Sequence, residues 1–337
     1  MIVEESVSLS TLTPLKVGGI ARYVCTVTTL ADVLEAVAFA SELRLPFRVI
    51  GGGSNVLAND EGYEGVLIRM NIEHISYEPY AAGIAVTAGA GVAWDALVAD
   101  VANQSLWGLE NLAGIPGTVG AAPVQNIGAY GAEISTTFVS ATVVDTERGE
   151  VQTYTKEDCE FGYRDSIFKH NRNLILCEVT FLLSKEPHPQ LGYSDVAQLV
   201  RDGVDMTTPL RIGEEVRRVR AKKFPDLSLE GTAGSFFKNP IVTEKQFAQL
   251  AEKYGAIPSF PATHGIKIPL AFILDRVLNL KGYKNTNGTV SLFGNQPLVV
   301  VASTGATANT IDMFANEIEK KVFDATGIVI EREVQKI

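Results

Sequence analysis

The segment 51–55 carries the first chemistry that the sequence offers, and it is chemistry of the main chain. It reads Gly-Gly-Gly-Ser-Asn and directly follows the apolar run 47–50, which we predict as a strand. Glycine lets the backbone approach a ligand closely and point successive N–H groups at an anion, while Ser54 and Asn55 add side-chain donors. The loop therefore suits a dinucleotide pyrophosphate; without a ligand, it would be an ordinary glycine-rich turn. It lacks the Gly-Lys-Ser/Thr of a Walker motif, and turn residues at 57–62 stand where a Rossmann helix should begin.

A second stretch, 114–131, is built almost entirely of small residues. Its eighteen residues include five glycines and two prolines and hardly any charge. Glycine and proline at this density do not allow a stable helix or a central strand. We interpret the segment as a backbone wall that lies against a flat or extended cofactor, with a tightly packed Gly/Ala loop as the alternative.

Segments 51–57 and 114–131 together resemble the FAD-binding half of the UDP-N-acetylenolpyruvoylglucosamine reductase family. The similarity extends from about residue 12 to the C-terminus, with several motifs in the same order. Segment 13–19, Thr-Pro-Leu-Lys-Val-Gly-Gly, departs from the Asn-Thr-Phe start that is usual in the family. The resemblance implies non-covalent FAD, which would be held by both glycine segments and one arginine: Gly51, Gly53, Ser54, Asn55, Val56, Ala121, Val124, Gly128 and Arg220.

The resemblance also implies the fold class, an α+β protein of three domains. Two domains would form a non-Rossmann FAD-binding module of the vanillyl-alcohol-oxidase-like class. We expect its two parts at 1–70 and 71–223, a substrate-binding α+β domain at 224–326, and a C-terminal strand returning to the active site at 327–337.

Three more motifs match the family and would carry the reaction. They are Phe-Gly-Tyr-Arg-Asp-Ser-Ile-Phe-Lys at 161–169, Gly-Ser-Phe-Phe-Lys-Asn-Pro at 234–240, and Glu-Arg-Glu-Val at 331–334. By resemblance, NADPH supplies hydride through FAD to UDP-N-acetylglucosamine enolpyruvate, giving UDP-N-acetylmuramate for peptidoglycan, cell wall biogenesis, cell shape and division. Negative charge then develops on the carboxylate-bearing side and must be stabilised and quenched by a proton.

The catalytic residues implied by the resemblance are Arg164, Ser235 and Glu333. Arg164 offers a planar, permanently charged donor fork for the substrate carboxylate, although a surface salt bridge is the commoner fate of an arginine. Ser235 would give the proton to carbon; its hydroxyl is a weak acid, and a turn or N-cap role is the alternative. Glu331 and Glu333 share a face of the predicted strand, so spacing does not choose between them and only the family motif favours Glu333.

Five further positions match residues around the substrate in the family. Tyr193 follows a loop rich in helix breakers and resembles the mobile tyrosine of one family subtype, where it closes over the substrate diphosphate. Lys223 aligns with a basic residue that meets phosphates, although a solvated lysine pair would look the same. The complete substrate-binding set is Tyr163, Tyr193, Lys223, Asn239 and Gln296.

Periodicity and punctuation predict the elements that must position these residues. Helices are expected at 30–43, 93–104, 212–222, 270–280 and 308–326, and a Thr-Glu-Lys-Gln capping box at 243–246 begins another that ends at Gly255. Strands are expected at 47–50, 65–68, 83–87, 139–144, 151–154, 174–183, 297–302 and 328–334. The pair 139–144 and 151–154 should form a hairpin.

Composition narrows the function classes. The net charge of −10 argues against nucleic acid as a partner, because phosphate backbones require a basic face. The sequence contains no run of 18 apolar residues, so we predict no membrane-spanning helix. Its acidic start is unlike the basic start of a signal peptide. Three cysteines without metal spacing fit a reducing cytoplasm, and four scattered histidines leave little basis for a metal site. We expect a cytoplasmic monomer.

Two other functions stay open on the sequence. A flavin oxidase of the same FAD-domain class would keep the glycine loops, but such enzymes often tether flavin through His or Cys, and neither glycine stretch contains either residue. A non-catalytic binding module for a nucleotide sugar would not need a proton donor such as Ser235. An absorbance spectrum and a turnover assay separate the three possibilities.

Overall fold

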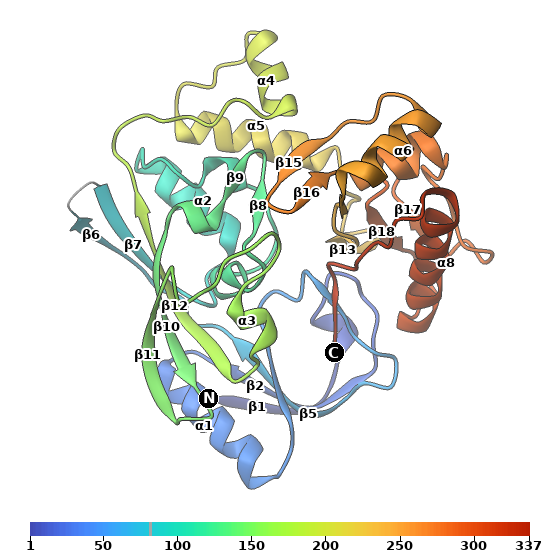
Figure 1. The fold of residues 1–337 in the computed structure, drawn as a ribbon. Helices are drawn as coiled ribbons and strands as arrows, with labels where there is room; N and C mark the ends of the chain where they lie inside the picture. Colours follow the sequence, from blue (N-terminus) through green and yellow to red (C-terminus); the bar gives the residue numbers. More distant parts are fainter. Residues whose placement is uncertain (81–82) are drawn as a thin grey trace. The chain divides into compact units, whose positions relative to one another are not determined.

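The computed structural model describes residues 1–80 and 83–337 (Figure 1). The chain divides into two compact units. The first unit comprises Met1–Val7, Ala21–Gly52 and Tyr63–Ala221. The second unit comprises Ser8–Ile20, Gly53–Gly62 and Lys222–Ile337. Since Gly52 and Gly53 fall in different units, the first glycine loop contributes to both.

The first unit begins with a four-stranded sheet in the order β1-β2-β5-β3: β1 (Ile2–Ser8), β2 (Ile20–Val27), β5 (Tyr63–Met70) and β3 (Phe47–Ile50). Both β2 and β3 run parallel to β5. The chain passes from β2 to β3 through α1 (Leu30–Glu42), whose start is fixed by a capping box between Thr29 and Asp32. The strand predicted at 47–50 is confirmed as β3, and the glycine loop leaves its carboxyl end.

A second, antiparallel sheet in the first unit has the order β11-β10-β12-β7-β6: β6 (Ile75–Tyr80), β7 (Gly83–Gly89), β10 (Phe138–Asp145), β11 (Glu150–Thr155) and β12 (Leu174–Leu183). The expected hairpin of β10 and β11 is confirmed, with Val144 opposite Val151. The strand expected at 174–183 is also confirmed. Residues from both sheets, among them Ile68 of β5 and Val144 of β10, share one buried cluster with α1.

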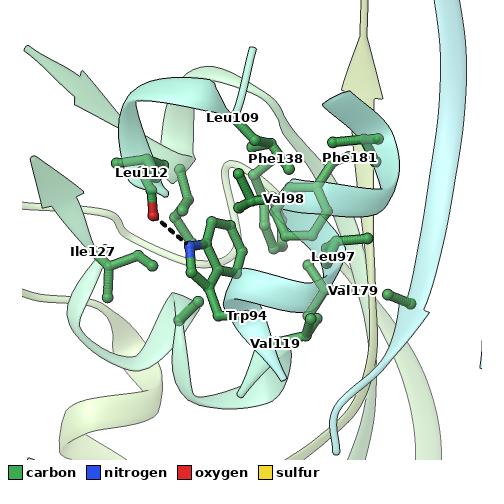
Figure 2. Close-up of a cluster of buried hydrophobic side chains, with 14 of the residues drawn as sticks. Trp94, Leu97, Val98, Leu109, Leu112, Val119, Ile127, Phe138, Val179 and Phe181 are labelled. Carbon is green, nitrogen blue, oxygen red and sulfur yellow. Dashed lines mark hydrogen bonds between the residues drawn. The ribbon is translucent and has the colours of Figure 1, made fainter. Parts of the chain in front are cut away.

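A large apolar core lies beside this sheet and includes apolar side chains of the second glycine segment (Figure 2). Trp94 opens α2 (Trp94–Asn103), is buried, and packs edge-on against Phe181 of β12 with ring centroids 5.7 Å apart. Its indole N–H donates to the Leu112 carbonyl at 3.0 Å. Val119 and Ile127 of the segment 114–131 lie in the same cluster. The small residues of the segment therefore sit on a packed support.

The second unit consists of short strands and helical segments around another core. Its sheets are β13-β18-β17, β14-β16-β15 and a parallel pair β19-β4: β4 (Val56–Leu57), β13 (Gly231–Ser235), β14 (Ile241–Val242), β15 (Phe260–Ala262), β16 (Gly265–Lys267), β17 (Val290–Leu292), β18 (Val299–Ala302) and β19 (Gln335–Lys336). The predicted capping box of Thr243 is present at α6 (Glu244–Tyr254), which ends at Gly255. The helix expected at 308–326 is α8 (Ala308–Thr326). Phe236 and Phe314 are fully buried in the core between these elements.

Three expected elements differ from the structure. The strand 328–334 is wrong: Ile328, Ile330 and Val334 are buried alternately, but the segment pairs only through a bridge between Arg332 and Phe237 within the described residues. The alternation of buried and exposed side chains therefore reflects packing against the core and not pairing in a sheet. The helix 270–280 is shorter, because α7 (Leu270–Phe272) passes into a π-helical turn at Ile273–Val277. The helix 212–222 begins earlier, as α5 (Pro209–Ala221).

The Trp94 packing leads to a stability prediction. Replacing Trp94 with phenylalanine leaves the buried Leu112 carbonyl without its donor and opens a small cavity, so the free energy of unfolding should fall by about 2–4 kcal/mol. Denaturant unfolding of the ligand-free protein measures this without the contribution of bound ligand. Phe323→Leu, at a half-exposed position on α8, is the control and should change stability by less than about 0.5 kcal/mol. Equal stabilities of the two variants would contradict the role of Trp94.

Candidate active site

In the first unit, the two glycine segments lie directly against each other. A Cβ atom built on Gly51 would be 2.3 Å from the Thr118 hydroxyl oxygen, and one on Gly52 would be 3.2 Å from the Gly117 Cα. A side chain at Gly51 would therefore force its neighbour to move. The Thr118 hydroxyl is buried and has no hydrogen-bond partner among the described residues. Since an unsatisfied buried hydroxyl is costly, this cradle fits a polar ligand that supplies the missing partner.

The rest of the first glycine loop is held within the second unit. Gly53 has a φ of +62°, and a Cβ there would be 2.4 Å from the Leu12 carbonyl oxygen. The Asn55 side-chain amide donates to the Glu333 carbonyl at 3.1 Å. Val56 pairs with Gln335 in the β4–β19 ladder. The loop predicted to bind the cofactor therefore also anchors the C-terminal segment.

The second glycine segment forms short turns, in keeping with the prediction that it cannot be a long helix or strand. Ala121 ends the 3₁₀ turn Val119–Ala121, and Val124 lies in the next turn, Pro123–Gln125. Gly128 begins a two-residue hairpin of β8 (Gly128–Ala129) and β9 (Ala132–Glu133). These three residues, which are predicted to bind the cofactor, therefore lie in short turns and a short hairpin.

Arg164 lies at the tip of a tight turn that contacts this segment. The N–H of Gly162 donates to the Asp165 carbonyl at 3.0 Å, and the N–H of Asp165 donates back at 3.4 Å. Arg164 itself has a φ of +55°, a region that a non-glycine residue occupies only at a cost. Its guanidinium donates to the Gly128 carbonyl at 2.6 Å and lies 5.6 Å from the Tyr163 ring centroid. The cation is thus fixed beside a predicted cofactor residue.

Arg220, on α5 of the first unit, is a second arginine that donates to the glycine segment. Its Nε–H donates to the Gly114 carbonyl at 3.0 Å, where the glycine segment starts. Burial lowers the pKa of Arg220, while the nearby Tyr130 and Asp95 favour its charged form. Asp95 holds the same end of the segment, because its carboxylate accepts from the Gly114 N–H at 2.6 Å and from the Arg217 Nε–H at 2.9 Å.

Two tyrosines meet at the other end of the segment. Tyr193 caps α4 (Ser194–Arg201), and its ring centroid lies 5.3 Å from that of Tyr130 in an edge-to-face contact. Burial raises the pKa of Tyr130 to about 12, so its phenol is neutral near pH 7. Burial also raises the pKa of Tyr193. Both rings therefore present hydroxyl donors.

Asn111 ties this tyrosine loop to the glycine segment. Its side-chain amide donates to the Tyr130 carbonyl and to the Gln190 carbonyl, both at 2.8 Å. The side chain is almost completely buried. Asn111 was missed by the sequence reasoning, as were Thr118 and Asp95. Residue type and spacing gave no signal for Asn111, since it precedes the glycine segment and its two partners lie 19 and 79 residues away.

In the second unit, the structure brings Ser235 and Glu333 onto adjacent extended segments. Ser235 ends β13 directly after Gly234, whose φ is +78°. The Glu333 N–H donates to the Phe236 carbonyl at 2.8 Å, and the Lys238 N–H donates to the Glu331 carbonyl at 2.9 Å. Residues 235 and 333, which are 98 positions apart in the sequence, thus lie on neighbouring backbone segments.

The two carboxylates that the sequence could not distinguish have different surroundings. The Glu331 side chain is exposed and forms an ion pair with the Lys238 ammonium at 2.9 Å. Glu333 is half-buried, and its backbone carbonyl is the acceptor for Asn55. The Glu331 carboxylate is therefore paired with Lys238 at the protein surface, on the same segment as Glu333.

Arg332, between these two glutamates, fastens the segment to α8. Its guanidinium donates to Glu319 at 2.5 Å, to the Asn316 side-chain oxygen at 2.6 Å, and to Asp312. Partial burial alone would raise the pKa of Asp312, but hydrogen bonds from Lys336 and Arg332 outweigh it and hold that pKa below its usual value.

The remaining predicted substrate residues also lie in the second unit. The Asn239 side-chain oxygen accepts from the Leu270 N–H at 2.9 Å and so caps α7. Gln296 forms a turn in which its carbonyl accepts from the Val299 N–H at 3.0 Å. The Asn295 amide donates to the Lys222 carbonyl at 2.9 Å, which places the neighbours of Gln296 and Lys223 together.

Metal and thiol chemistry find no support among the described residues. No group of three or more His, Cys, Asp or Glu side chains there could hold a metal ion. Burial raises the pKa of Cys159 and of Cys177 to about 12, so these thiols are not nucleophiles near pH 7. Of the helices in residues 1–80 and 83–337, none has the length and apolar character needed to cross a membrane.

Two family models match separate parts of the chain. A model described as an FAD binding domain matches residues 21–155, and one described as the C-terminal domain of UDP-N-acetylenolpyruvoylglucosamine reductase matches residues 226–337. The reductase of that name from Chromobacterium violaceum is 36% identical over 319 residues, covering 93% of this chain and 92% of its own. That from Pseudomonas aeruginosa is 38% identical over 308 residues, covering 90% of this chain and 89% of its own. The crystal structure of the Thermus caldophilus enzyme covers 100% of this chain and 99% of its own, with a TM-score of 0.70 and 26% identity.

The Arg332 contacts predict a pH-dependent contribution to stability. Arg332→Met leaves Glu319 without its cation and Asp312 with Lys336 alone, so the free energy of unfolding should fall by about 1–3 kcal/mol at pH 7. Because the pKa of Asp312 is lowered on folding, this stabilisation is complete above the unfolded pKa of about 4 and is lost as pH falls through the folded pKa. Denaturant unfolding at pH 7 and at pH 3 tests both statements.

Arg276→Met serves as the matched control. Arg276 pairs with Asp275 at 3.6 Å, and 73% of its side chain is exposed, so its loss should cost less than about 1 kcal/mol. If Arg332→Met is no less stable than Arg276→Met at pH 7, the Arg332 contacts do not stabilise the C-terminal segment.

Proposed function

We propose that this chain, which belongs to the UDP-N-acetylenolpyruvoylglucosamine reductase family, reduces UDP-N-acetylglucosamine enolpyruvate with Arg164, Ser235 and Glu333 as its catalytic residues. The enzyme is an FAD-dependent oxidoreductase of peptidoglycan precursor synthesis, and NADPH is the reductant of the proposed reaction. The observation that supports the assignment of roles most directly is the backbone pairing that sets Ser235 beside the Glu333 segment.

The residues present fit FAD. Gly51, Gly52 and the unpartnered Thr118 hydroxyl make a cradle that tolerates no side chain and lacks a polar partner. FAD, when bound, would supply the transfer of hydride between NADPH and the substrate. We assign its binding to the residues named from the family motifs: Gly51, Gly53, Ser54, Asn55, Val56, Ala121, Val124, Gly128 and Arg220.

The chain's own groups act on the enolpyruvyl carboxylate and the carbon that bears it. Hydride addition to the terminal alkene carbon leaves negative charge on the adjacent carbon and its carboxylate. The fixed guanidinium of Arg164 stabilises this charge, since a bidentate cation is most effective where charge develops. Ser235 then gives its hydroxyl proton to the carbon, completing a C–H bond. Glu333, on the neighbouring segment, acts on the enolate with Arg164 or supplies the proton that restores the serine hydroxyl.

Substrate binding is assigned to the residues that match the family's substrate positions. We propose that Tyr163, Tyr193, Lys223, Asn239 and Gln296 contact the nucleotide sugar. The neutral phenol of Tyr193 suits a hydrogen bond to the diphosphate. Three buried, unpaired cysteines suit a reducing compartment, and we propose that the enzyme acts as a monomer in the cytoplasm.

Ser235→Ala separates the two halves of the reaction, because only the second half needs a proton at carbon. NADPH-driven bleaching of the flavin should stay close to normal. Reoxidation by the enolpyruvyl substrate should slow by about 10²- to 10⁴-fold, the usual cost of losing a positioned proton donor. Stopped-flow absorbance with the FAD-loaded enzyme measures both rates, and failure of the unmodified enzyme to be reoxidised by this substrate would refute the proposed function.

Two further variants interpret the result. Ser235→Cys should keep more activity than Ser235→Ala, because a thiol can still deliver a proton. Ser291→Ala, on β17, is the matched control and should leave both half-reactions unchanged. If Ser235→Ala slows flavin reduction as much as reoxidation, then Ser235 supports the site and is not the proton donor.

Tyr193→Phe tests the role of the tyrosine loop. Losing one hydrogen bond to a charged group costs about 1.5–3 kcal/mol, so the substrate KM should rise about ten- to hundredfold. Flavin reduction by NADPH should stay nearly normal. Tyr80→Phe, at an exposed position of β6, is the control with the same chemical change. An unchanged KM for Tyr193→Phe would mean that the loop is only a connector.

A further inference from the structure

The turn that carries Arg164 is joined to the second glycine segment by three side chains. The Asn126 amide donates to the Gly162 carbonyl at 3.0 Å. The Arg164 guanidinium donates to the Gly128 carbonyl at 2.6 Å, and the Ser166 hydroxyl donates to the Val124 carbonyl at 2.8 Å. Alternate residues of the turn, 162, 164 and 166, are therefore each tied to the segment 124–128. The proposed catalytic cation and the proposed cofactor wall form one connected structure.

Asn126 is the member of this set with every side-chain hydrogen-bonding group engaged. It is almost completely buried, with 2% of its surface exposed. Its amide nitrogen donates to the Gly162 carbonyl and, at 3.2 Å, to the Glu133 carboxylate, while its oxygen accepts from the Ser135 N–H at 3.2 Å. The partners fix the orientation of the amide, since a carbonyl and a carboxylate require donors and an N–H requires an acceptor.

The backbone at Asn126 explains why an asparagine stands there. Its φ of 41° and ψ of 64° are left-handed, a conformation that asparagine adopts more readily than most residues. The Asn126 amide reaches Gly162, 36 residues further along the chain. Aspartate can occupy the same backbone and volume but cannot donate.

The Arg164 turn needs such support. Arg164 also has a left-handed φ, +55°, and strained residues of this kind persist only where the surroundings determine them. The next residue but one on each side, Gly162 and Ser166, is held by the glycine segment. The Lys169 ammonium donates to the Arg164 carbonyl at 2.9 Å and holds the same peptide from the other side.

We propose that Asn126 is a positioning residue for Arg164: its amide, donated to Gly162, sets the place of the guanidinium relative to the enolpyruvyl carboxylate. This inference rests on the proposed function. Asn126 acts through the turn and touches no reacting atom. Its effect belongs to the half-reaction in which charge develops on the carboxylate, because misplacement of a catalytic group by about 1 Å can cost about a hundredfold in rate.

Asn126→Asp is the direct test, since it keeps size, backbone preference and the acceptor for Ser135. It replaces both donated hydrogen bonds with repulsion from the Gly162 carbonyl and from Glu133. Reoxidation of the reduced, FAD-loaded enzyme by the enolpyruvyl substrate should slow about ten- to hundredfold, while flavin reduction by NADPH stays within about twofold. Asn173→Asp makes the same change at an amide that donates to Glu147 at 2.7 Å, and both of its half-reactions should stay normal.

The double variant Asn126→Asp with Glu133→Gln separates positioning from folding. The amide introduced at position 133 can donate to the carboxylate introduced at position 126, which removes the charge repulsion and should restore most of the lost thermal stability. The carboxylate still faces the Gly162 carbonyl, so reoxidation should stay slow. Recovery of the reoxidation rate together with stability would overturn the inference, because Asn126 would then serve only its own segment.

Hydrogen exchange reports the turn independently of catalysis. In the unmodified protein, the reciprocal hydrogen bonds of Gly162 and Asp165 should protect the peptide that covers 160–168. This peptide should exchange faster in Asn126→Asp and in the double variant, but not in Asn173→Asp. Unchanged exchange in Asn126→Asp, or a normal reoxidation rate, would refute the positioning role. If the unmodified enzyme is not reoxidised by the substrate, the proposed function fails, and the exchange result still decides whether Asn126 holds the turn.

Discussion

Close backbone approach within the segment 114–131 is the constraint on which the first unit depends. A Cβ atom on Gly120 would lie 2.5 Å from the Cβ of Ala90, and one on Gly51 would meet the Thr118 hydroxyl at 2.3 Å. The segment can therefore pack directly on the sheet and on the first glycine loop only because these positions lack side chains. Its larger members, among them Val119 and Ile127, enter the core around Trp94 and supply the apolar burial that the glycines cannot. The segment is therefore a closely packed backbone wall supported by an apolar core.

The same segment also provides carbonyl groups that accept hydrogen bonds from two arginines of the first unit. Arg220 is attached to its start through the Gly114 carbonyl, and Arg164 is attached near its end through the Gly128 carbonyl. The carboxylate of Asp95, at the start of the segment, accepts from Gly114 and from Arg217. A carbonyl acceptor orients a guanidinium without neutralising it, so these two contacts fix both arginines and leave their charge intact.

In the second unit, several separate contacts hold the segment 331–336 in place. Segment 331–336 is paired to residues 236–238, to β4 and, through Arg332, to α8. None of these contacts is extensive, and together they replace the long ladder that a closing strand would have made. The backbone N–H and carbonyl of Glu333 both make hydrogen bonds, so main-chain pairing sets the place from which its carboxylate extends.

The sequence by itself determined the elements whose signals are local. A capping box predicted the start of α6, and Gly255 predicted its end. Periodicity predicted α1 and α8, and apolar runs predicted β3, β12 and the β10–β11 hairpin. Glycine density also led to the prediction of a cofactor wall at 114–131, and residue motifs nominated Arg164, Ser235 and Glu333; these assignments stay predictions.

Only the tertiary structure decided the long-range partners. It showed that Glu331 pairs with Lys238, that Asn126 donates to Gly162 in the Arg164 turn, and that 328–334 has no ladder within the described residues. It also showed that Asn111 links the Tyr130 and Gln190 carbonyls. The physical reason is the distance along the chain: capping and periodicity act within a few residues, whereas the partners of these side chains are brought close only when the sheets and cores have formed.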